Sequence, residues 1–454
     1  MVFLLFLISR LALVTAHQLG STLATVNVRY AAEAQRAARQ GVSFYRLHEE
    51  ARRLEDPQSV PEERVIEYPP LAILWMKSTA SFLGPAPPSG PLPPDYIKSA
   101  SFANQAAMFL VDVCGFAILL LAGAGAAQLG VYTLGGLLLF PILYDRMDLL
   151  LGVLLLAAIL LLLRVRSPWP AFAVLAVAIN FKMTPLVLVP LFLLGTLPAG
   201  ALAGPVTFRT WRLILRNALV LGLIGVALFL PFFLHDGKDT LGFLSYHAKR
   251  GLEIASVWNT VPIALGAAVR WPVSASLRFG AVEINCPWTG ALRKLASFFT
   301  AAVIPALAIA LWMLLRHRVS SPGNPKLTMA QANPIFFTRC AGLCLLTATV
   351  FAPVFSPQYL LWLVPVAPLW EGKSRWWAWA AFLTICGLTT VHYPFFTGKV
   401  LGALSVEDAM PLWGRLLWPA PLILRNLALV VFTAWFWVDT RSSTSGHHPP
   451  VRTI

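Results

Sequence analysis

The sequence predicts an all-α membrane protein, a polytopic helical bundle of about 11–13 transmembrane helices. Three observations predict this class. Charged residues make up 12% of the 454 residues, whereas soluble proteins contain about 25%. Hydrophobic residues make up 57%, and the mean hydropathy is +0.70. Apolar stretches of bilayer length recur along the chain, and Lys and Arg gather in the short segments between them.

The apolar stretches place the expected spans, since a transmembrane helix needs about 20 mainly apolar residues. Such stretches occur at 2–17, 69–84, 101–123, 126–143, 147–163, 168–197, 213–234, 296–315, 334–352, 358–370, 376–392 and 419–438. The first has no basic segment before it and no clear cleavage site, so we expect a true span rather than a signal peptide. One transmembrane domain is therefore expected over 1–438, followed by a disordered cytoplasmic tail, 439–454.

Three hydrophilic regions interrupt the expected bundle. The first loop, 18–68, is rich in acidic residues, and the composition of 28–41 and 43–56 predicts two helices that lie along the membrane surface. The second large loop, 235–295, contains the apolar piece VPIALGAAV, which is too short to cross and favours a re-entrant segment. The third region, 393–418, is short.

Basic residues in short loops indicate the orientation of the spans. The segments 164–166, 209–216, 316–318 and 372–375 are basic, which places them in the cytoplasm and the three hydrophilic regions on the opposite face. Simple counting from the N-terminus puts 164–166 outside. We therefore favour an arrangement in which one of the two weak spans between 101 and 143 does not cross fully, which moves 144–148 to the outer face.

The net charge of +15 would suggest nucleic acid as the partner of a soluble protein. Because there is no basic domain and no basic patch with interleaved aromatic residues, we exclude nucleic acid and expect anionic membrane lipid instead. The five cysteines lie singly or at helical spacing, so neither a disulfide framework nor a metal site is predicted. No cofactor follows from the motifs, and no acidic pair is diagnostic of a divalent cation.

An ionisable side chain inside hydrocarbon costs at least about 2.5–3.5 kcal/mol, so each one needs a partner, a cavity or a function. In LYDRMDLLLG, Asp145 and Asp148 are spaced by one helical turn, with Arg146 between them. This spacing favours either a catalytic pair of carboxylates or a helix-end charge cluster that pairs with itself.

Cations stand at two further places. Lys182 in INFKMTPLVLVP lies within an apolar stretch, so it either extends to the interface or faces a cavity and binds an anion. The segment YHAKRG groups Tyr246, His247 and Arg250, which would suit phosphate capture, although a solvated loop has the same composition. His392 is interpreted as a structural histidine.

Two motifs combine proline with polar groups at the expected membrane boundary. Glu67 and Tyr68 precede Pro69 and Pro70, which indicates either a plain helix start or a rigid corner from which Glu67 projects into an outer cavity. FSPQYLLW breaks a pair of spans and places Gln358 and Tyr359 at membrane depth, where irregular backbone must line a cavity or be buried.

Taken in order, six segments resemble a known family. RVIEYPPLA, LLLFPILYDRMDLLLG, INFKMTPLVLVPLFLL, YHAKRGLEIASVWNT, FSPQYLLWLVPVAPL and PLILRNLALVV are similar to segments of the bacterial polyprenol-phosphate-dependent glycosyltransferases of the GT-C superfamily. The nearest group is glycosyltransferase family 87, which contains α-1,2-mannosyltransferases. The resemblance covers nearly the whole chain.

The resemblance implies an inverting transferase in the inner (cytoplasmic) membrane, with its active site on the extracytoplasmic face. It would move a hexose or pentose, with mannose favoured, from a polyprenyl-phosphate donor to a glycolipid or glycan acceptor, using a carboxylate as general base. On this reading the catalytic carboxylates are Glu67, Asp145 and Asp148. The donor phosphate would be bound by Arg146, Lys182, Tyr246, His247 and Arg250. The cavity would be lined by Asn27, Tyr30, Tyr68, Gln358 and Tyr359.

The sequence departs from the family pattern at two positions. Family members carry an Asp shortly after the first span, where Asn27 stands here, and often a Lys near the position of Pro353. A non-catalytic relative that binds lipid-linked sugar is therefore the first alternative. A transporter of lipid or sugar is the second, because Lys182 lies within a span that prolines interrupt, although no internal repeat supports it.

Overall fold

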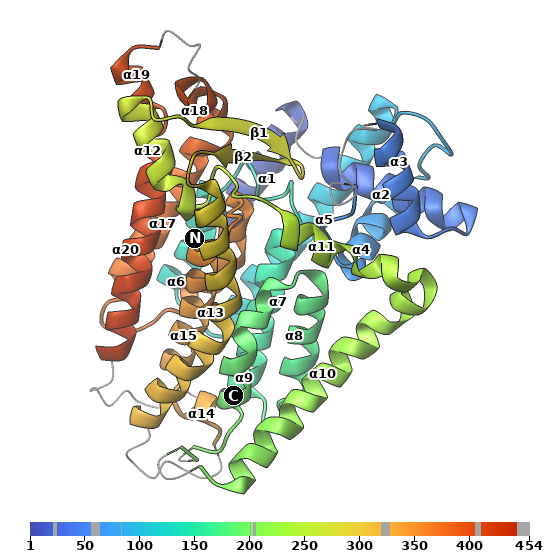
Figure 1. Ribbon diagram of the computed structural model, residues 1–454. Helices are drawn as coiled ribbons and strands as arrows, with labels where there is room; N and C mark the ends of the chain where they lie inside the picture. The colour runs from blue at the N-terminus through green and yellow to red at the C-terminus, as the bar shows by residue number, and fades with distance from the viewer. Residues whose placement is uncertain are drawn as a thin grey trace.

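The computed structural model describes residues 1–20, 25–55, 64–82, 84–199, 201–202, 206–318, 327–404 and 410–442. Within these ranges the chain is mostly helical and forms an elongated bundle, with a smaller group of helices beside one end (Figure 1). The predicted helical membrane class is confirmed. One short β-hairpin is the part of the fold that the sequence reading did not include.

The longer bundle helices overlap expected spans, whereas the expected span 358–370 consists of short helical pieces. The α-helices of the bundle come from most of the described chain. They are α1 (Val2–Gly20), α5 (Pro94–Leu121), α6 (Ala126–Leu138), α7 (Asp148–Arg164), α8 (Trp169–Phe181), α9 (Val189–Gly195), α10 (Phe208–Asp236), α13 (Thr289–Arg318), α14 (Met329–Ala332), α15 (Pro334–Phe351), α16 (Leu360–Leu363), α17 (Arg375–Thr390) and α20 (Ala420–Ser442).

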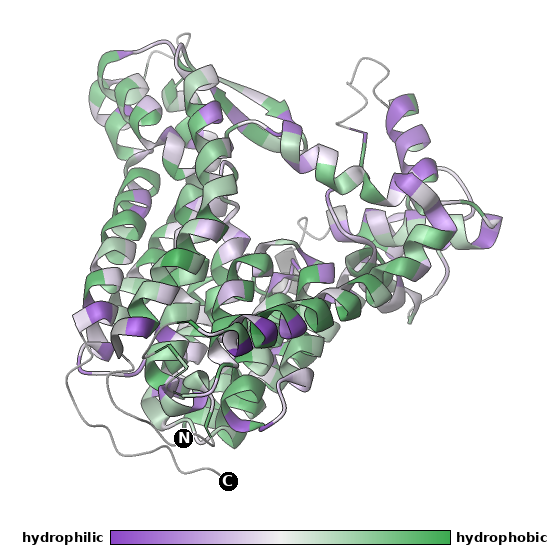
Figure 2. Cartoon of the chain, turned by 60° about the horizontal axis from the view of Figure 1, so that its bottom comes forward, coloured by the Kyte–Doolittle hydropathy of each residue, from purple (hydrophilic) through white to green (hydrophobic). Residues whose placement is uncertain are grey.

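Five helical stretches in the described residues are long and apolar enough to cross a bilayer. They are Pro94–Leu121, Phe208–Lys249, Thr289–Arg316, Pro334–Phe351 and Leu412–Ser442. Figure 2 shows hydrophobic residues along the bundle helices and a concentration of hydrophilic residues on the smaller group of helices beside them. The chain is therefore a multi-pass membrane protein, and the total of about 11–13 crossings stays a prediction.

Helix α7 lies at the centre of the bundle, where it packs against α5, α8 and α16. Its sequence is apolar on every side after Asp148, which is the pattern of a helix surrounded by protein. At Gly152 a Cβ would lie 2.5 Å from the carbonyl oxygen of Leu361. This glycine therefore permits the close approach of α16, which brings the 356–359 segment to the end of α7.

The acidic first region contains the two predicted helices, α2 (Thr25–Gln40) and α3 (Phe44–Glu55). Gly41 joins them with a positive φ of 63°, a conformation that glycine adopts without strain. The apolar face of α2 packs on α4 (Pro70–Ser81) and α5. Of the predicted loop 18–68, residues 21–24 and 56–63 lie outside the described residues.

The second polar region folds into short elements that cap one end of the bundle. They are α11 (Gly242–Lys249), α12 (Thr260–Val269), β1 (Ser274–Arg278) and β2 (Ala281–Asn285). The strands are antiparallel and are joined at Phe279 and Gly280, which both have positive φ, the geometry that suits a tight hairpin. The sequence analysis expected a loop over 235–295 and did not include this hairpin, because a strand of five residues has little characteristic pattern in a sequence.

The apolar piece 261–269 lies within α12, which packs against α18 (Thr397–Leu404), α19 (Leu412–Leu417) and α20. Its side chains join a separate small core with Val273, Val400 and Leu422. Of the third polar region, residues 405–409 lie outside the described residues. The predicted tail also begins too early, since α20 continues as helix to Ser442. The rest of it, 443–454, is outside the described residues.

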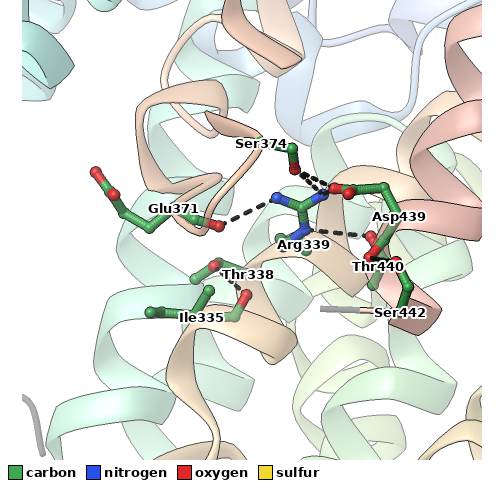
Figure 3. A network of polar contacts seen from close by, with 8 residues as sticks. All are labelled: Ile335, Thr338, Arg339, Glu371, Ser374, Asp439, Thr440 and Ser442. Atoms are coloured by element: carbon green, nitrogen blue, oxygen red, sulfur yellow. Dashed lines mark hydrogen bonds and ion pairs between the residues drawn. The ribbon is translucent and has the colours of Figure 1, made fainter. Parts of the chain in front are cut away.

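A polar network closes the opposite end of the bundle, around Arg339 (Figure 3). The guanidinium contacts Asp439 and Ser374, and it donates from Nη1 to the carbonyl oxygen of Glu371 at 3.1 Å and from Nε to Thr440 at 3.3 Å. The network joins the start of α15, the start of α17 and the end of α20.

Candidate functional site

One cavity of about 360 Å³ lies where the capping elements meet the bundle. It lies between α2 and α3, the segment before α4, α11, the β-hairpin and the loops that follow α6 and α15. Most of the predicted site residues line it. They are Tyr30, Glu67, Tyr68, Arg146, Lys182, Tyr246, His247, Arg250, Gln358 and Tyr359. These ten residues come from six separate parts of the sequence, which the fold brings together in one space.

Lys182 faces this cavity because the span that carries it is broken. Helix α8 ends at Phe181, Lys182 is extended with φ −160° and ψ 134°, and a 3-10 helix starts at Thr184. Pro185 favours the break, since proline cannot donate a helical hydrogen bond and restricts the residue before it. Of the two alternatives for Lys182, the structure therefore supports the one in which its side chain faces a cavity, and not the one in which it extends to the interface.

The Lys182 ammonium is held by an acid and two rings. Its Nζ atom lies 2.7 Å from Oδ1 of Asp148, 4.9 Å from the Tyr359 ring centroid and 5.0 Å from the Trp362 ring centroid. The two rings stack on each other at 4.2 Å. One face of the ammonium stays open, with 16% of the Lys182 side chain exposed. This geometry presents a positive charge to the cavity.

Asp148 lies below the cavity and does not line it. Its side chain is fully buried, and Oδ1 accepts hydrogen bonds from Lys182 and, at 2.7 Å, from Trp362 Nε1. As the first residue of α7 it is also stabilised by the positive end of the helix dipole. The buried carboxylate positions Lys182, so the structure does not bring Asp148 into contact with a ligand in this cavity.

Asp145 and Asp148 do not share a helix face, contrary to the expectation from their spacing. Helix α7 starts at Asp148, and residues 141–147 form turns. Asp145 is buried at 2% exposure, and its Oδ2 lies 4.0 Å from Nε of Arg146. Arg146 lines the cavity instead of Asp145. The prediction assumed that the helix started one turn earlier.

The turn that carries Arg146 is anchored from behind. Asn27 donates to the carbonyl oxygen of Asp145 at 2.9 Å, and Asn104 donates to that of Tyr144 at 3.1 Å. Asn27 therefore supports the turn from outside the main cavity, which corrects its predicted place in the lining. The Tyr144 hydroxyl donates to Oδ2 of Asp112 at 2.7 Å.

Asp112 in turn belongs to a buried ion pair that sequence reasoning missed. Nε of Arg10 on α1 lies 2.8 Å from Oδ2 of Asp112 on α5, and both side chains are almost completely buried. The Arg10 guanidinium also donates to the carbonyl oxygen of Thr133 at 3.0 Å. The sequence does show one basic and one acidic residue within two expected spans. Because 102 residues separate them, their pairing could not be predicted from the sequence.

Glu67 lines the cavity. This agrees with the interpretation of Glu67–Pro70 as a rigid corner rather than a plain helix start. Its Oε2 atom lies 3.7 Å from Nη1 of Arg250, and its carbonyl oxygen accepts from Nε2 of His247 at 3.0 Å. Pro69 and Pro70 then start α4. Glu67 therefore bridges the first polar region to the segment that follows α11.

Arg250 is held loosely by acids and packs on a ring. Its Nη2 lies 3.9 Å from Oε2 of Glu253, and its guanidinium lies 5.7 Å from the Tyr246 ring centroid. The Tyr246 hydroxyl donates to the carbonyl oxygen of Phe279, which connects α11 to the hairpin. Burial raises the pKa of Glu253 above its ordinary value, although Arg250 opposes this shift. The carboxylates of Glu67 and Glu253 thus lie 3.7 and 3.9 Å from Arg250, beyond hydrogen-bond distance.

The cavity also contains functional groups that sequence reasoning did not select. They are Arg29, His48, Arg52, Glu253, His392 and Tyr393. A signal existed for the first three, since Arg29, His48 and Arg52 lie on amphipathic helices of mixed charge. Their convergence depends on how α2 packs on α3, which the sequence does not display.

The lining has the chemistry of a site for an anionic ligand with hydrogen-bonding groups. Arginine and lysine outnumber the carboxylates in it, and tyrosine rings supply flat apolar faces with hydroxyl groups at their edges. Among the described residues no group of three or more His, Cys, Asp or Glu is placed to hold a metal ion.

No protein-family model matches the sequence, and neither a curated protein nor a solved structure matches it. The functional argument therefore depends on the geometry of the cavity.

Proposed function

We propose that the protein is a membrane glycosyltransferase that moves a hexose or pentose, with mannose favoured, from a polyprenyl-phosphate donor to a glycolipid or glycan acceptor. The resemblance to family 87 of the GT-C superfamily belongs to this proposal, as does the extracytoplasmic placement of the site. One observation carries it. Lys182, Arg146 and Arg250, which are distant in sequence, line one cavity at the end of an apolar bundle.

The cations provide the leaving-group chemistry that such a transfer needs. As the bond between the anomeric carbon and the phosphate oxygen breaks, negative charge grows on the phosphate, and fixed cations stabilise that charge more strongly than the ground state. Arg250 can offer two parallel hydrogen bonds to phosphate oxygens, whereas Lys182 acts as a point charge fixed by Asp148. The stacked rings of Tyr359 and Trp362 keep water from one side of Lys182.

The test is a transfer assay with the full-length protein in lipid vesicles. Polyprenyl-phosphate [14C]mannose is the donor probe, octyl α-mannoside is the acceptor probe, and the labelled product is separated by chromatography. We expect transfer by the wild type and a loss of about 100- to 1,000-fold in Lys182→Met, the range found when one charge-stabilising donor is removed from an active site.

The matched control is Lys98→Met, which removes an exposed lysine of α5 and should leave the rate unchanged. Wild-type transfer that survives in Lys182→Met would contradict the site assignment. Binding of the donor by the wild type without any transfer would favour the non-catalytic alternative.

A further inference from the structure

Transfer with inversion places a geometric requirement on the general base. The acceptor oxygen attacks the sugar from the side opposite to the leaving phosphate, and in inverting glycosidases the two catalytic groups lie about 6.5–9.5 Å apart. Oε2 of Glu67 is 3.7 Å from Nη1 of Arg250, so no sugar ring fits between them. Glu67 therefore lies on the side of the cations that would hold the phosphate, and the base has to come from another wall.

A histidine and a carboxylate form a pair on the wall made by α2 and α3. Nδ1 of His48 lies 2.5 Å from Oε2 of Glu33, and the two side chains are only 4% and 6% exposed. The other Glu33 oxygen accepts from Nε of Arg29 at 2.9 Å. The pair connects two helices that are joined only by the short turn at Gly41.

Glu33 is kept ionised, and this fixes the tautomer of the histidine. Burial opposes its charge, but the hydrogen bonds and charges of His48 and Arg29 outweigh burial and lower the pKa of Glu33. A carboxylate can only accept hydrogen bonds, so Nδ1 of His48 carries the proton. A ring that carries one proton then has its lone pair on Nε2, which has no hydrogen-bond partner in the part of the chain that the structure describes.

His48 lines the same cavity as Lys182 and Arg146, and it comes from α3 whereas they come from the ends of bundle helices. Tyr30 packs edge-on against His48 at 5.4 Å between ring centroids, and Tyr68 packs edge-on against Tyr30 at 5.9 Å. The three rings form a continuous aromatic wall that starts at α3 and ends next to α4. A sugar on this wall would have His48 at one end of it.

We propose that His48, oriented by Glu33, accepts the proton of the acceptor hydroxyl in the transfer reaction. This inference rests on the proposed function and replaces Glu67 as the base. The acceptor O–H bond breaks and its proton moves to Nε2 of His48, while the acceptor oxygen forms a bond to the anomeric carbon. The bond from that carbon to the phosphate oxygen breaks, and its electron pair leaves with the lipid phosphate, next to Lys182 and Arg250.

The pair also accounts for the departure of the sequence from the family pattern. Asn27 stands where the family that the sequence resembles carries an Asp, and an amide does not accept a proton. Glu33 lies less than two helical turns further along α2, where it contacts His48. A carboxylate is thus still present in the first polar region, and it acts through the imidazole.

The test combines two substitutions with chemical rescue in the same vesicle assay. His48→Ala removes the imidazole, and His48→Asn keeps a side-chain donor for Glu33 but has no basic nitrogen. Both should lower the transfer rate by about 100- to 10,000-fold, the usual contribution of a general base. Added imidazole should restore part of the rate in His48→Ala, and the restored rate should increase with the basicity of substituted imidazoles.

A purely structural clamp between α2 and α3 would not give this rescue. Binding of polyprenyl phosphate, measured with the same variants, should stay within about threefold of the wild type, since the cations are untouched. The matched control is His235→Ala, which removes an exposed histidine that also pairs with an acid, Asp236, at 2.9 Å. It should show neither loss nor rescue.

The outcomes separate this inference from the proposed function. Wild-type transfer together with full activity of His48→Asn overturns the role of His48 and leaves the transferase intact. A loss in His48→Ala that no imidazole restores, with donor binding intact, also overturns it. A wild type that transfers no sugar from the lipid phosphate overturns both.

Discussion

The two ends of the bundle use arginine in opposite ways. At the closed end, every nitrogen of the Arg339 guanidinium has an oxygen partner, and the guanidinium also lies 4.4 Å from the ring centroid of Phe436. At the cavity, the carboxylates nearest to Arg250 are 3.7 and 3.9 Å away, and its buried Nε has no partner among the described residues. An arginine whose hydrogen-bond donors all have partners stabilises a fold. An arginine at a cavity with donors left over is available to bind a ligand.

Removal of the closed-end arginine should give the largest effect on stability. In Arg339→Met the half-buried Asp439, whose side chain is 19% exposed, loses its cation, and breaking a fully buried pair costs about 3–5 kcal/mol, which sets the upper limit here. The midpoint of unfolding of the purified protein in detergent should fall strongly, while sugar transfer per folded molecule stays the same. The control is Arg441→Met, an exposed arginine on the same helix. If Arg339→Met also lowered the transfer rate per folded molecule, the two ends of the bundle would not differ in function as we infer.

The cavity arginine should show the reverse pattern. Arg250→Gln removes a charged partner of the phosphate, and hydrogen bonds to charged groups contribute about 1.5–3 kcal/mol, or about 10- to 150-fold in affinity. The affinity for polyprenyl phosphate, titrated in micelles, should fall by this factor, with a change in stability below that of Arg339→Met. If Arg250→Gln lowers the unfolding midpoint and leaves the affinity for polyprenyl phosphate unchanged, Arg250 is a structural residue like Arg339.

A smaller effect should come from packing near the closed end. At Gly342 of α15 an added Cβ would lie 2.3 Å from Nε1 of Trp370, and overpacking of this kind costs about 1–3 kcal/mol. Gly342→Ala should therefore lower the unfolding midpoint moderately without a change in donor affinity. Gly398→Ala serves as the control, since no atom lies within 4 Å of its new Cβ. Equal effects of the two variants would show that the closed end is not tightly packed.

Helix positions followed from the sequence because the membrane requires long apolar stretches. The break at Lys182 was also indicated, since Pro185 lies three residues beyond it. Because cavity-lining cations and aromatic rings stood out against an apolar background, ten of the predicted site residues line the cavity. Single polar residues in hydrocarbon are thus strong signals even without related sequences.

The errors came from pairings and boundaries that only packing decides. The Asp145 and Asp148 spacing suggested a shared helix face, but α7 starts at the second of them. Arg10 and Asp112 are 102 residues apart, and Glu33 meets His48 only because α2 turns back onto α3 at Gly41. No local pattern encodes these contacts, since each depends on the crossing of two helices.

The first helix supports the cavity as well as the apolar bundle. Arg10 neutralises Asp112, Asp112 accepts from Tyr144, and Tyr144 lies in the turn that presents Arg146 to the cavity. A fusion that exchanges α1 for a generic hydrophobic leader would leave a lone carboxylate in hydrocarbon and loosen that turn. Topology reporters and affinity tags should therefore be added outside Val2–Gly20 and never substituted for it.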